Sequence, residues 1–133
     1  MNISSNNEYG KLKAVIIGRP DGANWPKDDP HFQTYWKFGA KGPAKFPYNV
    51  PEEIITEVNE NIFNIIDRLQ ELGVDVIRPK ATNWKSAFAT HDWICTGMNN
   101  LTMRETLVTI GNKVIECPHI YRSKHYESIS YGN

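Results

Sequence analysis

The sequence is poor in cysteine, and this excludes several kinds of stabilised or metal-bound fold. Its 133 residues contain only Cys95 and Cys117, which lie 22 positions apart. Two cysteines at this distance form neither a disulfide framework nor the paired ligands of a structural zinc site. This usage is typical of a reducing compartment, and we expect both residues to be small apolar core residues without catalytic function.

The sequence also has no excess of charge of either sign and no long apolar run. Its 15 basic and 15 acidic residues cancel, which argues against nucleic acid as a partner, because phosphate neutralisation needs a clustered positive surface. No stretch approaches the roughly 20 apolar residues of a membrane span. The first residues lack the basic start and apolar block of a secretory signal. We therefore expect a cytoplasmic protein with no membrane contact.

What the sequence does contain is a strand, helix and strand in succession. Residues 12–18 form a short apolar run, which predicts a central strand buried on both faces. Residues 51–72 predict an amphipathic helix, and residues 74–78 a second strand parallel to the first. The apolar positions that predict the helix recur at steps of three and four: Ile54, Val58, Ile62, Ile65, Leu69 and Leu72.

A long connection with many aromatic residues separates the first strand from the helix. Residues 20–50 show no sustained period, which predicts a connection without regular secondary structure. Such a segment is either a binding or partner-contact loop, or a flap folded over the core. Its aromatic residues are Trp25, Phe32, Tyr35, Trp36, Phe38, Phe46 and Tyr48.

The second half of the sequence contains a predicted β-hairpin with a carboxylate at its start. Residues 106–110 and 113–117 are β-rich and are separated by Gly111-Asn112, a pair that suits a tight two-residue turn. Glu105 directly precedes the first strand. A carboxylate fixed there can accept two parallel hydrogen bonds from a guanidinium group, although an exposed Arg104-Glu105 pair can equally be solvated.

Residues 90–95 contain a weak metal-site pattern. His91 and Cys95 would share one face of a helix, but the neighbouring sequence supplies no second pair and Gly97 argues against a long helix. We therefore predict no metal site, and interpret the segment as a loop with a buried cysteine. Asp92 is expected to cap a turn through the adjacent backbone.

Several segments, in order, resemble one enzyme family. Residues 7–19 resemble the opening strand of the glycine and inosamine-phosphate amidinotransferases, and residues 72–79 resemble their second strand. Residues 96–118, with Met103-Arg104-Glu105 and the hairpin, resemble their Arg-Asp strand and hairpin. Arg122-Ser123 and Tyr126-Glu127 match the start of the next helix.

The resemblance implies an α/β fold, in which residues 1–133 form a single domain. This domain is the N-terminal portion of a five-bladed, pentein-like propeller, about one blade plus the hairpin of the next. It implies a substrate-binding site at Glu105 and Arg104, in which Glu105 binds the guanidinium of arginine and Arg104 braces the edge of the site. Glu105 stands where the family has Asp, so its side chain reaches one methylene further. The family needs no cofactor.

The resemblance also implies that this chain is inactive by itself. The family's nucleophilic cysteine, near the C-terminus, and its histidine lie beyond the segments matched here, so no catalytic residue is assigned. Its open edges would then be covered by the missing C-terminal blades or by self-association. Two alternatives remain open: part of an arginine deiminase-like hydrolase, and a stand-alone guanidino-binding or oligomeric interaction module.

Overall fold

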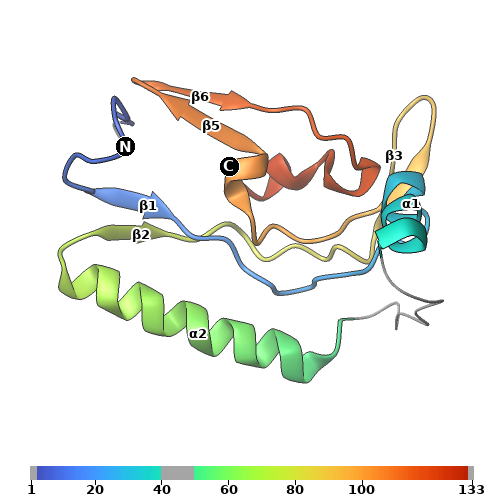
Figure 1. Ribbon diagram of the computed structural model, residues 1–133, viewed down its shortest axis with the longest axis horizontal. Coiled ribbons are helices and arrows are strands. Elements are labelled where there is room, and N and C mark those ends of the chain that lie inside the picture. Colours follow the sequence, from blue (N-terminus) through green and yellow to red (C-terminus); the bar gives the residue numbers. More distant parts are fainter. Residues whose placement is uncertain (1–2, 40–49, 132–133) are drawn as a thin grey trace.

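The described part of the protein contains three two-stranded sheets, one long helix and several short helical segments. The structure is a computed structural model that describes residues 3–39 and 50–131. In Figure 1 the long helix α2 lies on one side of the β1–β2 pair and the β5–β6 hairpin lies on the other. The mixed helix and strand content agrees with the expected α/β class.

The strand–helix–strand unit predicted from the sequence is present. Strands β1 (Ala14–Ile16) and β2 (Asp75–Ile77) are parallel, with Val15 opposite Val76, and α2 (Glu52–Glu71) connects them. The prediction that the first strand is buried on both faces is wrong. Among the described residues β1 pairs only with β2, and its Ile16 is 38% exposed.

Helix α2 is confirmed, but only part of its predicted apolar stripe is buried. The buried residues of α2 are Ile55, Ile62 and Ile66, of which only Ile62 belongs to the predicted stripe. Three of the predicted stripe positions lie outside, with exposures of 47% for Ile54, 54% for Ile65 and 66% for Leu72. The apolar face of α2 is therefore wider than the surface that the described residues lay against it.

The long connection is not irregular throughout, which corrects the prediction made for residues 20–50. Helix α1 (Pro30–Gly39) lies within it. Asp29 caps this helix, because its Oδ1 accepts hydrogen bonds from the backbone N–H groups of His31 and Phe32. Phe32 is buried, with its ring 5.9 Å from that of Trp25. The aromatic residues Phe46 and Tyr48 lie outside the described residues.

A second hairpin, which the sequence did not predict, contains the segment considered as a metal pair. Strands β3 (Ala87–Ala89) and β4 (Ile94–Thr96) are antiparallel. The His91 side chain is 98% exposed in the turn, whereas Cys95 is fully buried on β4, so the two do not share a helical face. Thr90 caps the turn by accepting from the N–H groups of Asp92 and Trp93; Asp92 does not cap it as expected.

The predicted hairpin after Glu105 is confirmed with its two-residue turn. Strands β5 (Leu107–Ile110) and β6 (Lys113–Glu116) are antiparallel, and Gly111 has the positive φ of 59° that this turn requires. Ser5 bridges to Gly111, which fixes the N-terminal segment beside the hairpin tip (Figure 1). Three 3-10 helices complete the described chain: η1 (Met103–Glu105), η2 (Arg122–Lys124) and η3 (Glu127–Tyr131).

Candidate functional site

A fully buried carboxylate, Asp29, fixes the elements around the candidate site. Besides capping α1, it accepts hydrogen bonds through Oδ2 from the backbone N–H and the hydroxyl of Ser123, at 2.9 and 2.8 Å. Ser123 lies in η2 and is itself buried. A single side chain thus fixes the start of α1 against η2, 94 residues further along the chain.

The loop after β4 is attached to the same region. Asn24 donates hydrogen bonds from Nδ2 to the Thr96 hydroxyl and to the Gly97 carbonyl. The Asp28 carboxylate accepts from both the backbone N–H and the hydroxyl of Thr96. Residues 24–29 and the β4 end therefore form one hydrogen-bonded frame, from which the next loop, residues 98–102, leads to Glu105.

These segments enclose a pocket of about 380 Å³. Its lining combines aromatic side chains with the charged groups Glu105 and Lys124 and with His119, whose ring stacks on that of Tyr121. Flat apolar surfaces beside a few convergent polar groups are typical of small-molecule sites. The lining residues are Trp25, Phe32, Met98, Asn99, Leu101, Thr102, Glu105, His119, Tyr121 and Lys124.

Glu105, the predicted guanidinium-binding residue, lies at the end of η1 and lines this pocket. Its Oε2 accepts hydrogen bonds from the Lys124 ammonium and, at 3.0 Å, from the Thr102 hydroxyl, and it lies 3.6 Å from Nε2 of His119. The hydrogen bond from Lys124 holds the pKa of Glu105 below its ordinary value. The side chain is 47% exposed, so Glu105 is an ionised carboxylate that a ligand can reach.

Lys124 and Glu127 are functional candidates that the sequence reasoning missed. The Lys124 side chain is only 6% exposed, and its ammonium lies between Glu105 and Glu127, 3.9 Å from Oε1 of Glu127. Glu127 is 1% exposed; its Oε2 accepts from the Thr106 hydroxyl, while its Oε1 accepts no hydrogen bond. Burial raises the pKa of Glu127 to about 7. The signal that was available is the i, i+3 spacing of Lys and Glu.

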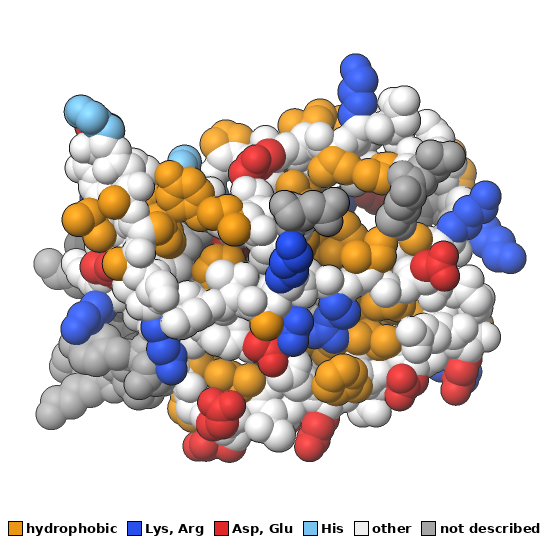
Figure 2. All heavy atoms as spheres, turned by 180° about the vertical axis from the view of Figure 1, so that it is seen from behind, with side chains coloured by type: hydrophobic (Ala, Val, Ile, Leu, Met, Phe, Trp, Pro, Cys, Tyr) orange, Lys and Arg blue, Asp and Glu red, His pale blue; other side chains and the backbone are white. Residues whose placement is uncertain are grey.

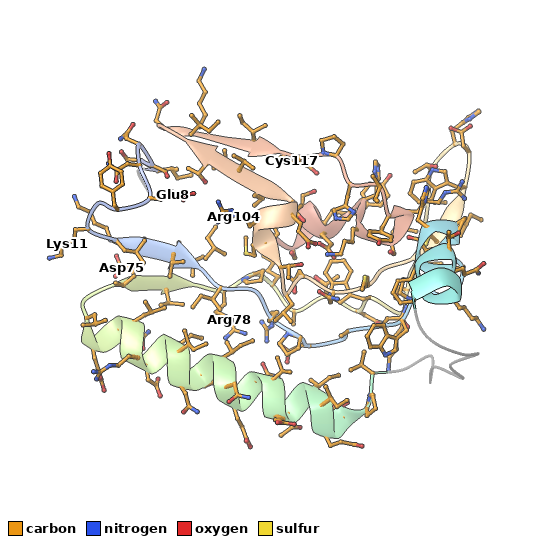
Figure 3. All side chains as sticks on the ribbon, in the orientation of Figure 1. Glu8, Lys11, Asp75, Arg78, Arg104 and Cys117 are labelled. Carbon is orange, nitrogen blue, oxygen red and sulfur yellow. The ribbon has the colours of Figure 1, made fainter. Side chains whose placement is uncertain are left out.

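Arg104, the other predicted binding residue, does not lie in the pocket. Its guanidinium donates to Glu8 at 2.9 Å, and both side chains are more than 80% exposed. Figure 3 shows Arg104 between β1 and the β5–β6 hairpin, on the side of Glu8. The side chains of Arg104 and Glu105 therefore point to different partners, although the two residues are adjacent in the sequence.

Neither cysteine is placed as a nucleophile. Cys95 is fully buried, as expected, and burial raises its pKa to about 12, so the thiol stays protonated at neutral pH. Cys117 is half-buried, not a core residue as expected, and lies just after β6. In residues 3–39 and 50–131, no group of three or more His, Cys, Asp or Glu side chains is arranged to hold a metal ion.

Comparison with known proteins finds amidinotransferases both by sequence and by structure. Glycine amidinotransferase, mitochondrial, of Xenopus tropicalis is 33% identical over 97% of this chain. Inosamine-phosphate amidinotransferase 1 of Streptomyces griseus is 29% identical, also over 97%. A solved inosamine-phosphate amidinotransferase from Streptomyces griseus superposes on 97% of the chain with a TM-score of 0.87 and 28% identity. The chain is a homologue of the amidinotransferases.

The homology covers the chain almost completely, but it covers only part of these relatives. The chain spans 31% of the Xenopus enzyme and 38% of the solved Streptomyces enzyme. A second solved structure, an amidinotransferase from Microseira wollei in the saxitoxin biosynthetic pathway, matches with a TM-score of 0.77, 28% identity and 36% coverage of its chain. No family model matches this amidinotransferase homologue. No helix in its described part has the length and apolar character needed to cross a membrane.

Proposed function

We propose that this chain is the N-terminal part of an amidinotransferase-like protein and supplies a guanidinium-binding carboxylate, Glu105. The observation that carries the proposal is an ionised, half-exposed Glu105 in a pocket with aromatic side chains, within a chain homologous to amidinotransferases. An arginine-like ligand would place its guanidinium at Glu105 and its apolar stem against Trp25 or Tyr121. Arg104 then braces the neighbouring edge through Glu8.

The resemblance to the family implies a double-displacement reaction in the intact protein. To this reaction the chain contributes only substrate binding. A thiolate attacks the guanidinium carbon of arginine, ornithine leaves, and the amidino group passes from cysteine to an amine. We place the nucleophilic cysteine and the histidine in the part of the relatives that this chain does not span. The chain with arginine and glycine should therefore release no ornithine. The proposal includes a cytoplasmic location and no cofactor.

The fold proposed with this function is about one blade of a five-bladed propeller plus the hairpin of the next. Two features support it. One is the exposed flank of α2, which carries Ile54 and Ile65, and the other is strand β6, all four residues of which are exposed. Figure 2 shows apolar side chains at the surface of one face, some of them near the acidic side chains along its lower edge. In an intact propeller further blades would cover such surfaces.

Without those blades, we expect the chain to self-associate through the exposed flank of α2. Sedimentation velocity should show dimers or larger species, and Ile65→Glu should shift them towards monomer, because it places a charge in an apolar contact. Gln70→Glu, at an exposed position of the same helix, is the matched control. A folded wild-type monomer at high concentration would contradict this expectation.

The binding role of Glu105 is tested by titrating arginine into wild type and Glu105→Gln. Loss of the charged acceptor should weaken arginine binding by at least about 10-fold, since a hydrogen bond to a charged group contributes about 1.5–3 kcal/mol. Glu116→Gln, on the exposed strand β6, removes the same charge away from the pocket and should leave the affinity unchanged. Equal affinities of wild type and Glu105→Gln would refute the proposal.

A further inference from the structure

We propose that Lys124 is an internal cation that occupies Glu105 in the empty site, and that a guanidinium ligand displaces it onto the buried carboxylate of Glu127. The inference rests on the proposed function and adds a residue that controls access to the same carboxylate. Nothing in the family resemblance assigns a role to Lys124.

Lys124 already makes the contacts that a guanidinium would seek. Its ammonium donates to Oε2 of Glu105 and, at 3.1 Å, to the hydroxyl of Thr102. It is a buried cation on the wall of the pocket, so a second cation arriving at Glu105 would meet it at short range and low solvent screening. A guanidinium can therefore pair with both carboxylate oxygens of Glu105 only if the Lys124 ammonium moves away from Oε2.

Glu127 offers the ammonium a second partner on its other side. Its Oε1 is buried and accepts no hydrogen bond, although it lies only 3.9 Å from Nζ of Lys124. A buried acceptor without a donor is costly, and a charge-assisted N–H···O bond needs about 2.8 Å. A shift of the Lys124 ammonium by about 1 Å is thus enough for it to leave Glu105 and to form a hydrogen bond with Oε1 of Glu127.

The other charged groups around Lys124 favour this exchange. His119, which also faces Glu105, has its pKa lowered by burial and by the Lys124 charge, so it is neutral at pH 7 and adds no competing cation. On the inner side, Glu127 faces Lys124, the Thr106 hydroxyl, the backbone N–H of Asn99 and, at longer range, Glu105 and Tyr131. Lys124 is therefore the only cation in the described part of the chain that contacts both carboxylates.

The first test is the arginine affinity of Lys124→Met, measured by calorimetry on the purified protein. Removing the internal competitor should tighten arginine binding about 10-fold, and Lys113→Met, on the exposed hairpin strand, should not change it. If wild type binds arginine through Glu105 and Lys124→Met binds no more tightly, the inference is wrong while the proposed function stands. If neither protein binds arginine, both are wrong.

The second test separates a displaced lysine from a general effect of nearby charge. Glu127→Gln should weaken arginine binding about 10-fold in the wild-type background, because the displaced ammonium then lacks an anionic partner. In Lys124→Met the same substitution should have no effect, since no ammonium is displaced. Equal effects in the two backgrounds would overturn the inference.

A third measurement needs no lysine variant and decides the question if Lys124→Met does not fold. Ligand binding requires the ionised form of Glu127, so the arginine affinity of wild type should rise between pH 6 and pH 8. In Glu127→Gln the affinity should be flat over this range, apart from any change that His119 contributes to both proteins. A wild-type affinity that is independent of pH would contradict the displacement of Lys124 onto Glu127.

Discussion

Replacement of Asp29 by alanine is expected to destabilise the protein by about 4 kcal/mol. The Asp29 carboxylate is fully buried and accepts four hydrogen bonds, two from the first turn of α1 and two from Ser123. Its removal costs a helix cap and leaves the buried N–H and hydroxyl of Ser123 without an acceptor. Urea unfolding followed by circular dichroism measures the loss.

The matched control for this prediction is Asp92→Ala. Asp92 lies in the exposed turn between β3 and β4, where its carboxylate contacts the ring of His91. An exposed pair of this kind contributes little, so the control should change the free energy of unfolding by less than about 0.5 kcal/mol. Asp29→Asn keeps one side-chain acceptor, so its loss of stability should lie between those of Asp29→Ala and Asp92→Ala. Equal stabilities of Asp29→Ala and Asp92→Ala would contradict the role given to Asp29.

Glu127→Gln is expected to remove a stability loss that wild type suffers as the pH rises. Burial raises the pKa of Glu127 from 4.5 to about 7, so the folded state favours the protonated carboxyl. The corresponding stabilisation is complete below about pH 4.5 and is lost as the pH rises through 7. The difference between these pKa values corresponds to about 3 kcal/mol.

The measurement is the free energy of unfolding of both proteins between pH 5 and pH 8. Relative to wild type, Glu127→Gln should become more stable as the pH increases. His119 acts in the opposite direction, because its lowered pKa costs stability as the pH falls below 6.5, but it is present in both proteins and cancels in the difference. A stability difference that does not change with pH would show that Glu127 titrates normally.

The parts of the fold that the sequence predicted are those with local signals. Helix α2 follows from apolar spacing and from the glycine after its end, and the β5–β6 hairpin follows from Gly111-Asn112. Helix α1 also has a local signal in the sequence. Asp29 followed by Pro30 is a strong helix start, but the surrounding prolines and aromatics suggested an irregular segment.

The parts that could not be predicted depend on contacts between distant residues. Apolar residues at Ile54 and Ile65 indicate a helix face, but nothing local says whether the chain contains a surface to cover it. The pairing of Glu105 with Lys124 joins residues 19 positions apart across the hairpin, so it has no periodic signature. For the same reason the sequence predicted that Arg104 and Glu105 share one site, whereas in the structure the Arg104 guanidinium pairs with Glu8, 96 residues earlier in the chain.

The most direct test of the central proposal is to titrate the wild-type protein with arginine and with citrulline. The two ligands have nearly the same shape, but citrulline carries a neutral urea group in place of the guanidinium. If the Glu105 carboxylate recognises a guanidinium cation, arginine should bind at least about 10-fold more tightly than citrulline. Equal affinities, or binding of neither ligand by the folded protein, would contradict a guanidinium-binding role for this pocket.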